Sequence, residues 1–435
     1  MNVPRISTLH PATRRLLIAR ALRSVGQGAL VVDFALYLNA LHWSGAAIGL
    51  ILSASGLFGA ALSLLIGIGS DSIRRKPFLL IYEGIAAVGS VVAFATAQPL
   101  LLSVVAVLGA FGRGANGAAG PFSPAEQAWL AEQILPNRRG TVYSLNSALG
   151  FFGMALGAGL AALPALWRGY LPGAESYRPL FLIVTLASLA NLWILSATEE
   201  SHRAQTRAQA RTAATKAAPV RREENAALLK LVLVNAFNGA AVGLTGPLIA
   251  YWFALKFSVG PASIGPVFAV TFVATGLASL ATGKLSSHIG VVRSVVWGRL
   301  LGLVMLVVLP LIPLYWIAAL IYLLRSALNR GTVGARQALA IGLVRDERRG
   351  LASSMNTVSM QLPQAAGPTF AGLLLDAGQL ALPFYVAAVL QGLYLFLYQR
   401  IFARYDETSR ADGKHQAGQD CEGKAPTPSP PVDAK

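Results

Sequence analysis

The sequence predicts an all-α membrane protein with twelve transmembrane helices in two similar six-helix bundles. Three observations predict this fold. Charged residues are scarce and gathered in short stretches, twelve apolar stretches are long enough to cross a bilayer, and the two halves of the chain repeat each other. Together they indicate a polypeptide that is surrounded by lipid rather than by water.

Composition gives the first observation. Of the 435 residues, 54% are hydrophobic and only 13% are charged, against about 25% charged in a typical soluble domain. The net charge is +17, but the basic residues lie between apolar stretches, as in cytoplasmic loops of membrane proteins, so we expect no nucleic-acid partner. The one cysteine, Cys421, lies in a polar tail, which excludes a disulfide framework and a cysteine metal site.

Twelve apolar stretches are each near the ~20 residues that a helix needs to cross ~30 Å of hydrocarbon. We place them near 17–41, 45–68, 77–97, 100–131, 142–166, 179–197, 227–254, 261–282, 292–312, 314–341, 351–375 and 380–402. The fourth is too long for a straight crossing, and we expect Pro121 and Pro124 to kink it. The chain then divides into a first bundle over 1–197, a polar central linker over 198–226, a second bundle over 227–403 and a disordered tail over 404–435.

Basic residues in the short loops predict the orientation. One side has thirteen of them and the other has three, namely Arg168, Arg178 and Lys256. Because the basic side stays in the cytoplasm, we expect both termini to be cytoplasmic in a bacterial-type inner membrane. Arg14, Arg15, Arg20 and Arg23 lead directly into the first apolar stretch without a cleavage site, so we expect no signal peptide.

An internal repeat supports the two-bundle fold. The segment RRGTVYSLNS over 138–147 matches RRGLASSMNT over 348–357 without gaps, an offset of 210 residues. Earlier in each half, GAAIG over 45–49 matches PASIG over 261–265, an offset of 216. A parallel repeat of six helices predicts two bundles related by an axis along the membrane normal, with a ligand site between them near the midplane.

The loop between the second and third stretches carries a recognisable motif. The segment GIGSDSIRRK over 67–76 resembles the loop signature G-x-L-[AGS]-D-R-x-G-R-[RK] of the major facilitator superfamily, and it departs from that signature at Gly69, Ser72 and Arg74. The resemblance covers roughly residues 15–402. It implies the twelve-helix facilitator fold, secondary transport and a cytoplasmic gate formed by this loop. The gate residues that it indicates are Gly67, Ser70, Asp71, Arg75 and Lys76.

Two further contacts complete the expected gate. Glu132 ends the fourth stretch and could pair with Arg75. Glu126 and Arg336 occupy equivalent positions of the repeat and have opposite charges. We hypothesise that these two residues form a salt bridge between the bundles that stabilises the outward-facing state, with pairing inside each half as the alternative.

Ionisable residues inside the apolar stretches are the candidates for the transport site, because each costs at least ~2.5–3.5 kcal/mol to insert. Asp33 in the first stretch is a candidate proton carrier, since a carboxylate removed from water is more easily protonated. Arg113 opens R-G-A-N-G, which is similar to the fourth-helix pattern of proton-coupled family members, and Asn116 shares its helical face. Arg325 and Arg330 could contact substrate. Structural ion pairs are the alternative for each. For Glu83, snorkelling or pairing with a loop arginine is favoured.

The function that follows is secondary transport of a small organic solute by a monomer, with proton coupling and a slight preference for efflux by antiport. The alternatives are uptake or exchange of an anionic metabolite, and a membrane sensor or assembly partner that does not transport. Gly153 and Gly157 predict a close helix contact in the fifth stretch. Catalytic, phosphate-binding and metal-binding motifs are lacking, so we expect no enzyme, cofactor or metal.

Overall fold

The computed structural model describes most of both halves of the chain, over residues 10–69, 75–112, 126, 129–130, 139–199, 218–289, 291–333, 336, 339 and 349–422. These residues form helices and their connections. The first half contains α1 (Pro11–Ala40), α2 (Gly45–Gly69), α3 (Arg75–Ala95), α4 (Pro99–Leu108), α6 (Arg139–Leu160), the short α7 (Pro164–Trp167) and η3 (Gly173–Tyr177), and α8 (Arg178–Ser196).

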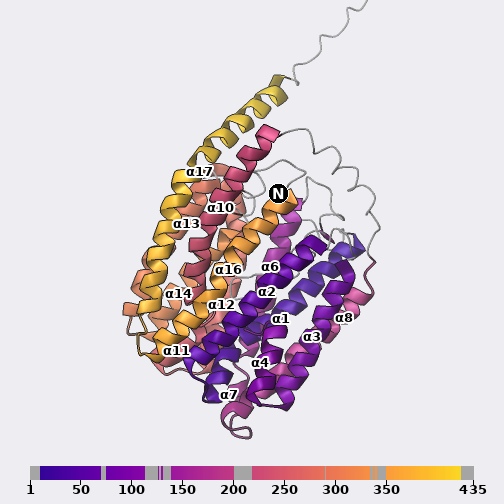
Figure 1. Ribbon diagram of the computed structural model, residues 1–435, viewed down its shortest axis with the longest axis vertical. Helices are drawn as coiled ribbons and strands as arrows, with labels where there is room; N and C mark the ends of the chain where they lie inside the picture. The colour runs from indigo at the N-terminus through magenta and orange to yellow at the C-terminus, as the bar shows by residue number, and fades with distance from the viewer. Residues whose placement is uncertain are drawn as a thin grey trace, which may run out of the picture.

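The second half repeats this order of long helices. It contains α10 (Ala218–Thr245), α11 (Ile249–Phe257), α12 (Pro261–Ile289), α13 (Val291–Val308), the short η5 (Leu309–Leu311), α14 (Tyr315–Gly331), α16 (Arg349–Asp376) and α17 (Leu382–Glu422). Figure 1 shows the first half as the indigo and magenta helices on the right and the second half on the left.

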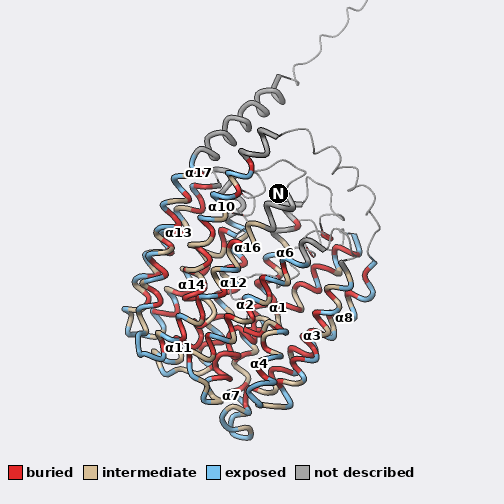
Figure 2. Tube along the Cα trace, viewed as in Figure 1, coloured by how far each residue is buried: buried red, intermediate tan, exposed pale blue. Residues whose placement is uncertain are grey.

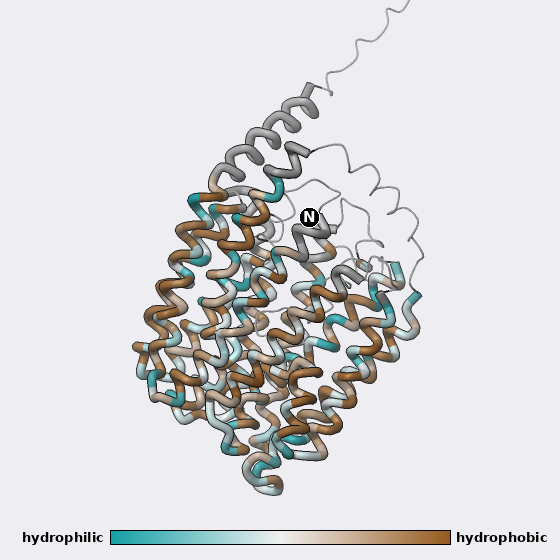
Figure 3. The backbone as a smooth tube through the Cα atoms, viewed as in Figure 1, coloured by the Kyte–Doolittle hydropathy of each residue, from teal (hydrophilic) through white to brown (hydrophobic). Residues whose placement is uncertain are grey.

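The helices are long and apolar enough for a bilayer. Nine segments of the described residues could cross a membrane by length and hydropathy, and α4, α14 and α16 occupy the other three expected crossings. Hydrophobic residues run along the helices (Figure 3), and exposed positions recur along the same helices (Figure 2). Many large hydrophobic residues are among the exposed ones. Trp193, Trp297 and Val389 each expose two thirds or more of their surface, which is expected where lipid covers the protein.

Matching helix contacts in the two halves bear out the repeat. In the first half α1 packs against α6 and α8, and α3 packs against α8. In the second half the equivalent helices, α10, α16, α17 and α13, make the same three contacts. The halves meet where α2 packs against α16 and α6 packs against α12, which are again equivalent pairs. The arrangement is therefore the pseudo-symmetric pair of bundles that the sequence predicts.

Glycines allow the closest contacts within each half. A Cβ atom at Gly157 of α6 would lie 2.8 Å from the Val25 carbonyl carbon and 2.8 Å from the Ala29 amide nitrogen, both backbone atoms of α1. The equivalent position in the second half is Gly367, where a Cβ would lie 2.5 Å from the Cα of Gly243 on α10. Only glycine fits at such distances, so the predicted packing face at Gly153 and Gly157 is present in the structure.

The fourth crossing breaks earlier than the sequence predicts. α4 ends at Leu108, and Ala110 and Gly112 then have positive φ angles of 54° and 70°. Gly112 adopts this conformation without steric cost, and the Tyr82 hydroxyl donates to the Gly109 carbonyl at 3.1 Å, which satisfies one of the groups freed by the break. The expected kink at Pro121 and Pro124 lies outside the described residues.

Two other boundaries differ from the predictions. The seventh crossing is not one helix over 227–254, because it divides into α10 and α11 around Pro247, which lacks an amide hydrogen and disfavours a helical residue before it. The tail was expected to be disordered from residue 404, but α17 continues to Glu422 and projects beyond the bundle (Figure 1). The stretch 404–422 lacks proline, and the helix ends just before Gly423.

Candidate functional site

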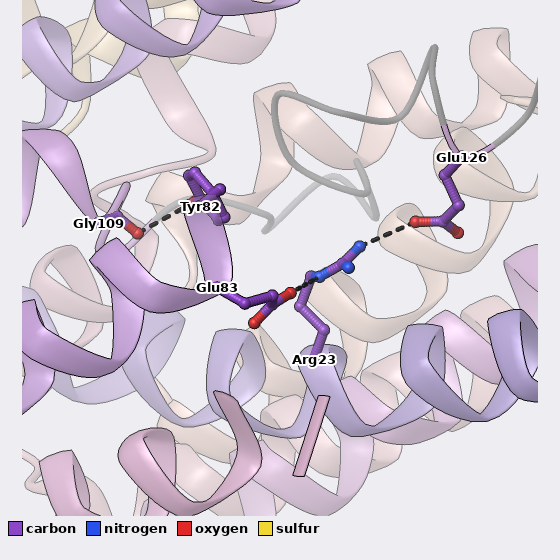
Figure 4. Close-up of polar contacts among 5 residues, drawn as sticks. All are labelled: Arg23, Tyr82, Glu83, Gly109 and Glu126. Carbon is purple, nitrogen blue, oxygen red and sulfur yellow. Dashed lines mark hydrogen bonds and ion pairs between the residues drawn. The ribbon is translucent and has the colours of Figure 1, made fainter. Parts of the chain in front are cut away.

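A buried ion network connects three helical segments of the first half. Arg23 of α1 donates to Glu83 of α3 and, at 2.8 Å, to Glu126. Their side chains are 6%, 1% and 2% exposed. Figure 4 shows the Arg23 guanidinium between the two carboxylates. Sequence analysis favoured a loop arginine as the partner of Glu83, and the partner is instead an arginine inside the bundle.

A second arginine balances the charge of this network. Arg20, 3% exposed, lies one turn before Arg23 on α1, close enough to Glu126 for electrostatic interaction. The Asn146 amide of α6 donates to Glu126 at 3.3 Å. Two arginines and two carboxylates therefore compensate one another, which a group of buried charges requires.

A cavity of about 40 Å³ lies beside the network and is lined by Arg23, Gln27, Tyr82, Glu83 and Ser188. Since one water needs roughly 10–15 Å³ of such space, the cavity has room for a few water molecules. Its wall also includes the broken end of α4 at Gly109 to Gly112. The break therefore brings backbone polar groups and the ion network to one internal space.

Asp33 lies on α1 about 10 Å before the helix end, at 1.5 Å per residue. It is 2% exposed, and neither carboxylate oxygen has a hydrogen-bond partner among the described residues. Tyr177 is near enough for electrostatic interaction. The neighbouring Phe34 packs edge-on against Phe111 with ring centroids 5.7 Å apart.

Four arginines lie inside the bundle in the described part of the second half. Arg325 and Arg330 lie on α14 and are half-buried, whereas Arg299 of α13 and Arg336 are 3% and 7% exposed. The Arg330 guanidinium contacts the Tyr322 hydroxyl at 3.1 Å and lies 5.5 Å from the Phe272 ring centroid. Between residues 227 and 402 the sequence has only three acidic residues, Asp346, Glu347 and Asp376, and the first two lie outside the described residues.

Several predicted site residues lie where the structure gives no description. These are Ser70, Asp71, Arg113, Asn116 and Glu132. Of the other gate residues, Gly67 lies in the last turn of α2 and Arg75 begins α3. The Lys76 ammonium donates to the carbonyls of Ser196 and Thr198 at 2.6 and 2.9 Å, at the C-terminus of α8, where the helix dipole favours a cation.

The hypothesised bridge from Glu126 to Arg336 is not formed in this arrangement. Glu126 pairs with Arg23 of its own half, and the Arg336 guanidinium contacts the Met360 sulfur at 3.2 Å. The bridge was expected in the outward-facing state, so it stays a prediction for that state.

The two halves are joined tightly at one end, which the charge pattern predicts to be the outer one. Here we call it the outer end. The Asp376 carboxylate at the end of α16 accepts from the amides of Gly45 and Ala46 at 2.6 and 2.7 Å. One turn further along α2, a Cβ at Gly49 would lie 2.8 Å from the Pro368 carbonyl carbon. The Ser53 and Thr369 hydroxyls are 2.7 Å apart. The outer ends of α2 and α16 are thus closed on each other.

Asp376 should stabilise this closed outer end. It satisfies two free amides at the N-terminus of a helix in the other half, and a cap of this kind contributes ~1 kcal/mol, or about fivefold in a population. Asp376→Ala should therefore raise the rate at which an impermeant maleimide labels Ser53→Cys, in a Cys421→Ser background, by about fivefold. Glu175→Ala, which removes an exposed carboxylate elsewhere, should leave the rate unchanged; equal labelling in both variants would contradict the role of Asp376.

Sequence reasoning missed three members of these contacts. Arg20 and Arg23 resemble the basic residues that precede a first crossing, but both follow its apolar start at Leu16 and are spaced by three residues. That spacing, with Glu83 alone in the third crossing, was an available signal. Asp376 had no signal, because its contact depends on how the two halves meet.

The comparisons with known proteins agree with this architecture. Residues 16–232 and 231–431 each match the sequence model of the Major Facilitator Superfamily. The uncharacterized membrane protein YJR124C of Saccharomyces cerevisiae is 22% identical over 401 residues, 85% of this chain and 89% of that protein.

Solved structures share the fold. A mutant of the nucleoside transporter NupG aligns with a TM-score of 0.70 at 13% identity, covering 90% of this chain and 100% of that one. A D-xylose-proton symporter aligns with a TM-score of 0.69 at 14% identity, covering 89% of this chain and 97% of that one. With two consecutive family matches and the paired bundles, the chain is a membrane transporter rather than an enzyme and belongs to the major facilitator superfamily.

Proposed function

We propose that this protein is a proton-coupled transporter of a small organic solute, acting as a monomer in a bacterial-type inner membrane with both termini in the cytoplasm. The observation that carries the proton coupling is Asp33, whose two carboxylate oxygens are buried and unpartnered among the described residues. A charged carboxylate in such a place costs at least ~2.5–3.5 kcal/mol. Asp33 is therefore our candidate for the group that carries the proton.

Release of that proton needs a change of surroundings. We propose that Arg113 supplies it by pairing with the Asp33 carboxylate in another state, since an adjacent cation favours the charged form of a carboxylate. The packing of Phe111 on Phe34 supports this, because these two residues are close to Arg113 and Asp33 in the sequence. One of the structural neighbours is named as a D-xylose-proton symporter, which supports proton-coupled transport as the class of mechanism.

The test is flux in proteoliposomes under an imposed pH gradient, with nucleosides, pentoses and dicarboxylates as candidate solutes. Asp33→Asn should abolish accumulation driven by the gradient and retain solute exchange at equal pH, because the variant still binds solute but carries no proton. Asp33→Glu is the matched control and should retain coupling. Full gradient-driven flux in Asp33→Asn would remove the proposed role of Asp33.

We propose efflux by proton antiport as the direction of transport. Efflux by antiport predicts that solute leaves the cytoplasmic side when protons enter. A second candidate, exchange of anionic solutes, is favoured by the four arginines of the second half. In the same vesicles, stimulation by an opposing gradient of the anion rather than of protons would favour exchange, and binding without flux would favour a sensor.

A further inference from the structure

The buried networks of the two halves are equivalent in place and opposite in charge. The offset of 210 residues relates Glu126 to Arg336, and the offset of 216 found earlier in each half relates Glu83 to Arg299. In the first half these two glutamates contact one central residue, Arg23 of α1. Both acidic positions have thus become arginines in the second half.

The central residue of the second half is Asn238 of α10, the helix equivalent to α1. The Arg299 guanidinium donates to the Asn238 side-chain oxygen, and its Nε lies 3.5 Å from the Thr332 hydroxyl. The Asn238 amide contacts the Met360 sulfur at 3.5 Å, and Arg336 contacts the same sulfur at 3.2 Å. Asn238, Arg299 and Arg336 therefore meet around Met360, from α10, α13 and the chain after α14.

Among the described residues, this cluster has no carboxylate like those that compensate Arg23 in the first half. Arg299 and Arg336 are 3% and 7% exposed and near enough to repel each other. The Nε of Arg336 is buried without a hydrogen-bond partner among the described residues. The buried ion pairs among the described residues are the two that Arg23 makes with Glu83 and Glu126. Buried cations need a counter-charge and hydrogen-bond acceptors to offset their desolvation. Asn238 and a thioether supply acceptors but no negative charge.

We propose that Asn238, Arg299 and Arg336 form a binding site for the anionic group, a carboxylate or a phosphate, of a small soluble solute. The guanidinium groups donate charge-assisted hydrogen bonds to its oxygens, a geometry that arginine provides better than lysine. The Asn238 amide is a further donor once it leaves the sulfur. The bound anion supplies the negative charge that the glutamate carboxylates supply to Arg23 in the first half. This inference deepens the proposed function by naming a solute class and its site.

The first test measures anion binding to the full chain in detergent by thermal unfolding, with succinate and inorganic phosphate as probes. Chloride keeps the ionic strength equal, and succinamide is the neutral analogue. Succinate or phosphate should raise the Tm of the wild type by about 3 °C or more at saturation, and succinamide should not. Arg336→Gln should lose the shift. Arg400→Gln, which removes an exposed arginine at the end of a crossing, should keep it.

The second test does not depend on the folding of an arginine variant. Asn238→Asp keeps the shape of the side chain and adds the missing negative charge. It should raise the Tm in the absence of anion and abolish the further rise with succinate or phosphate, because the site then contains its own counter-charge. Asn235→Asp, one turn away on α10, is the matched control and should retain the response to anion.

Three results would overturn the inference. They are an unchanged Tm of the wild type with both anions, an undiminished anion shift in Asn238→Asp, and a shift produced only by nanodiscs with phosphatidylglycerol. The last result would assign the arginines to lipid. Binding is measured without flux, so a wild-type protein that binds the anion but shows no pH-driven transport would count against the proposed proton coupling alone.

Discussion

Arg23→Met should be the most destabilising single substitution in the first half. Removing one partner of a buried ion pair costs about 3–5 kcal/mol, because the other charge is left uncompensated, and here Arg23 serves two carboxylates at once. Thermal unfolding in detergent measures the loss.

Two further variants separate the charge from the packing of Arg23. The double variant Arg23→Met, Glu83→Gln removes one charge of each sign, leaves Arg20 beside Glu126, and should recover much of the lost stability. Arg400→Met, at an exposed arginine, should change the Tm little. A loss in Arg23→Met that the double variant does not recover would place the effect in packing instead.

Gly157→Ala should cause the second largest loss of stability. The added methyl group would lie against the backbone of α1, 2.8 Å from both the Val25 carbonyl carbon and the Ala29 nitrogen. Backbone atoms cannot rotate away, so α6 and α1 must separate, and overpacking of this kind costs about 1–3 kcal/mol. Thermal unfolding and the yield of folded protein after solubilisation measure the effect.

The matched control for Gly157 is another helical glycine. A Cβ at Gly84 of α3 would meet no atom within 4 Å. Gly84→Ala should therefore be neutral or stabilise by up to ~1 kcal/mol, because alanine favours the helix over glycine. Equal changes in Tm for the two alanine substitutions would show that the close contact between α6 and α1 does not make Gly157 specially sensitive.

The fold could be predicted from the sequence because the bilayer leaves few choices. Backbone groups in hydrocarbon must bond within a helix, so long apolar stretches predict helices, and nine segments of the described residues are long and apolar enough to cross a membrane. The repeat determined how the helices group. The close contact at Gly153 and Gly157 was predictable for a similar reason, since small residues four apart leave one smooth helix face.

The partners of the charged residues could be predicted only in part. α1 is buried on most sides, with 78% of its most apolar window inside the protein, so hydropathy does not reveal which face of it meets which helix. Arg23 therefore resembled a cytoplasmic anchor, and Glu83 was left with a loop arginine as its favoured partner. The sequence places each of the four arginines inside the second bundle within an apolar stretch. It does not show that Arg299 and Arg336 lie together around Asn238 and Met360 without a described carboxylate beside them.

At the outer end, the described contacts between α2 and α16 are made by main-chain atoms, small side chains and the Asp376 carboxylate. These contacts include no bulky side chain that could swing aside, so we expect a passage at this end to form when whole helices move apart. That movement widens the molecule within one leaflet and compresses the surrounding acyl chains. The speed of the transport cycle is thereby tied to the thickness and lateral packing of the host membrane, and the same protein will work at different rates in short-chain and long-chain lipids.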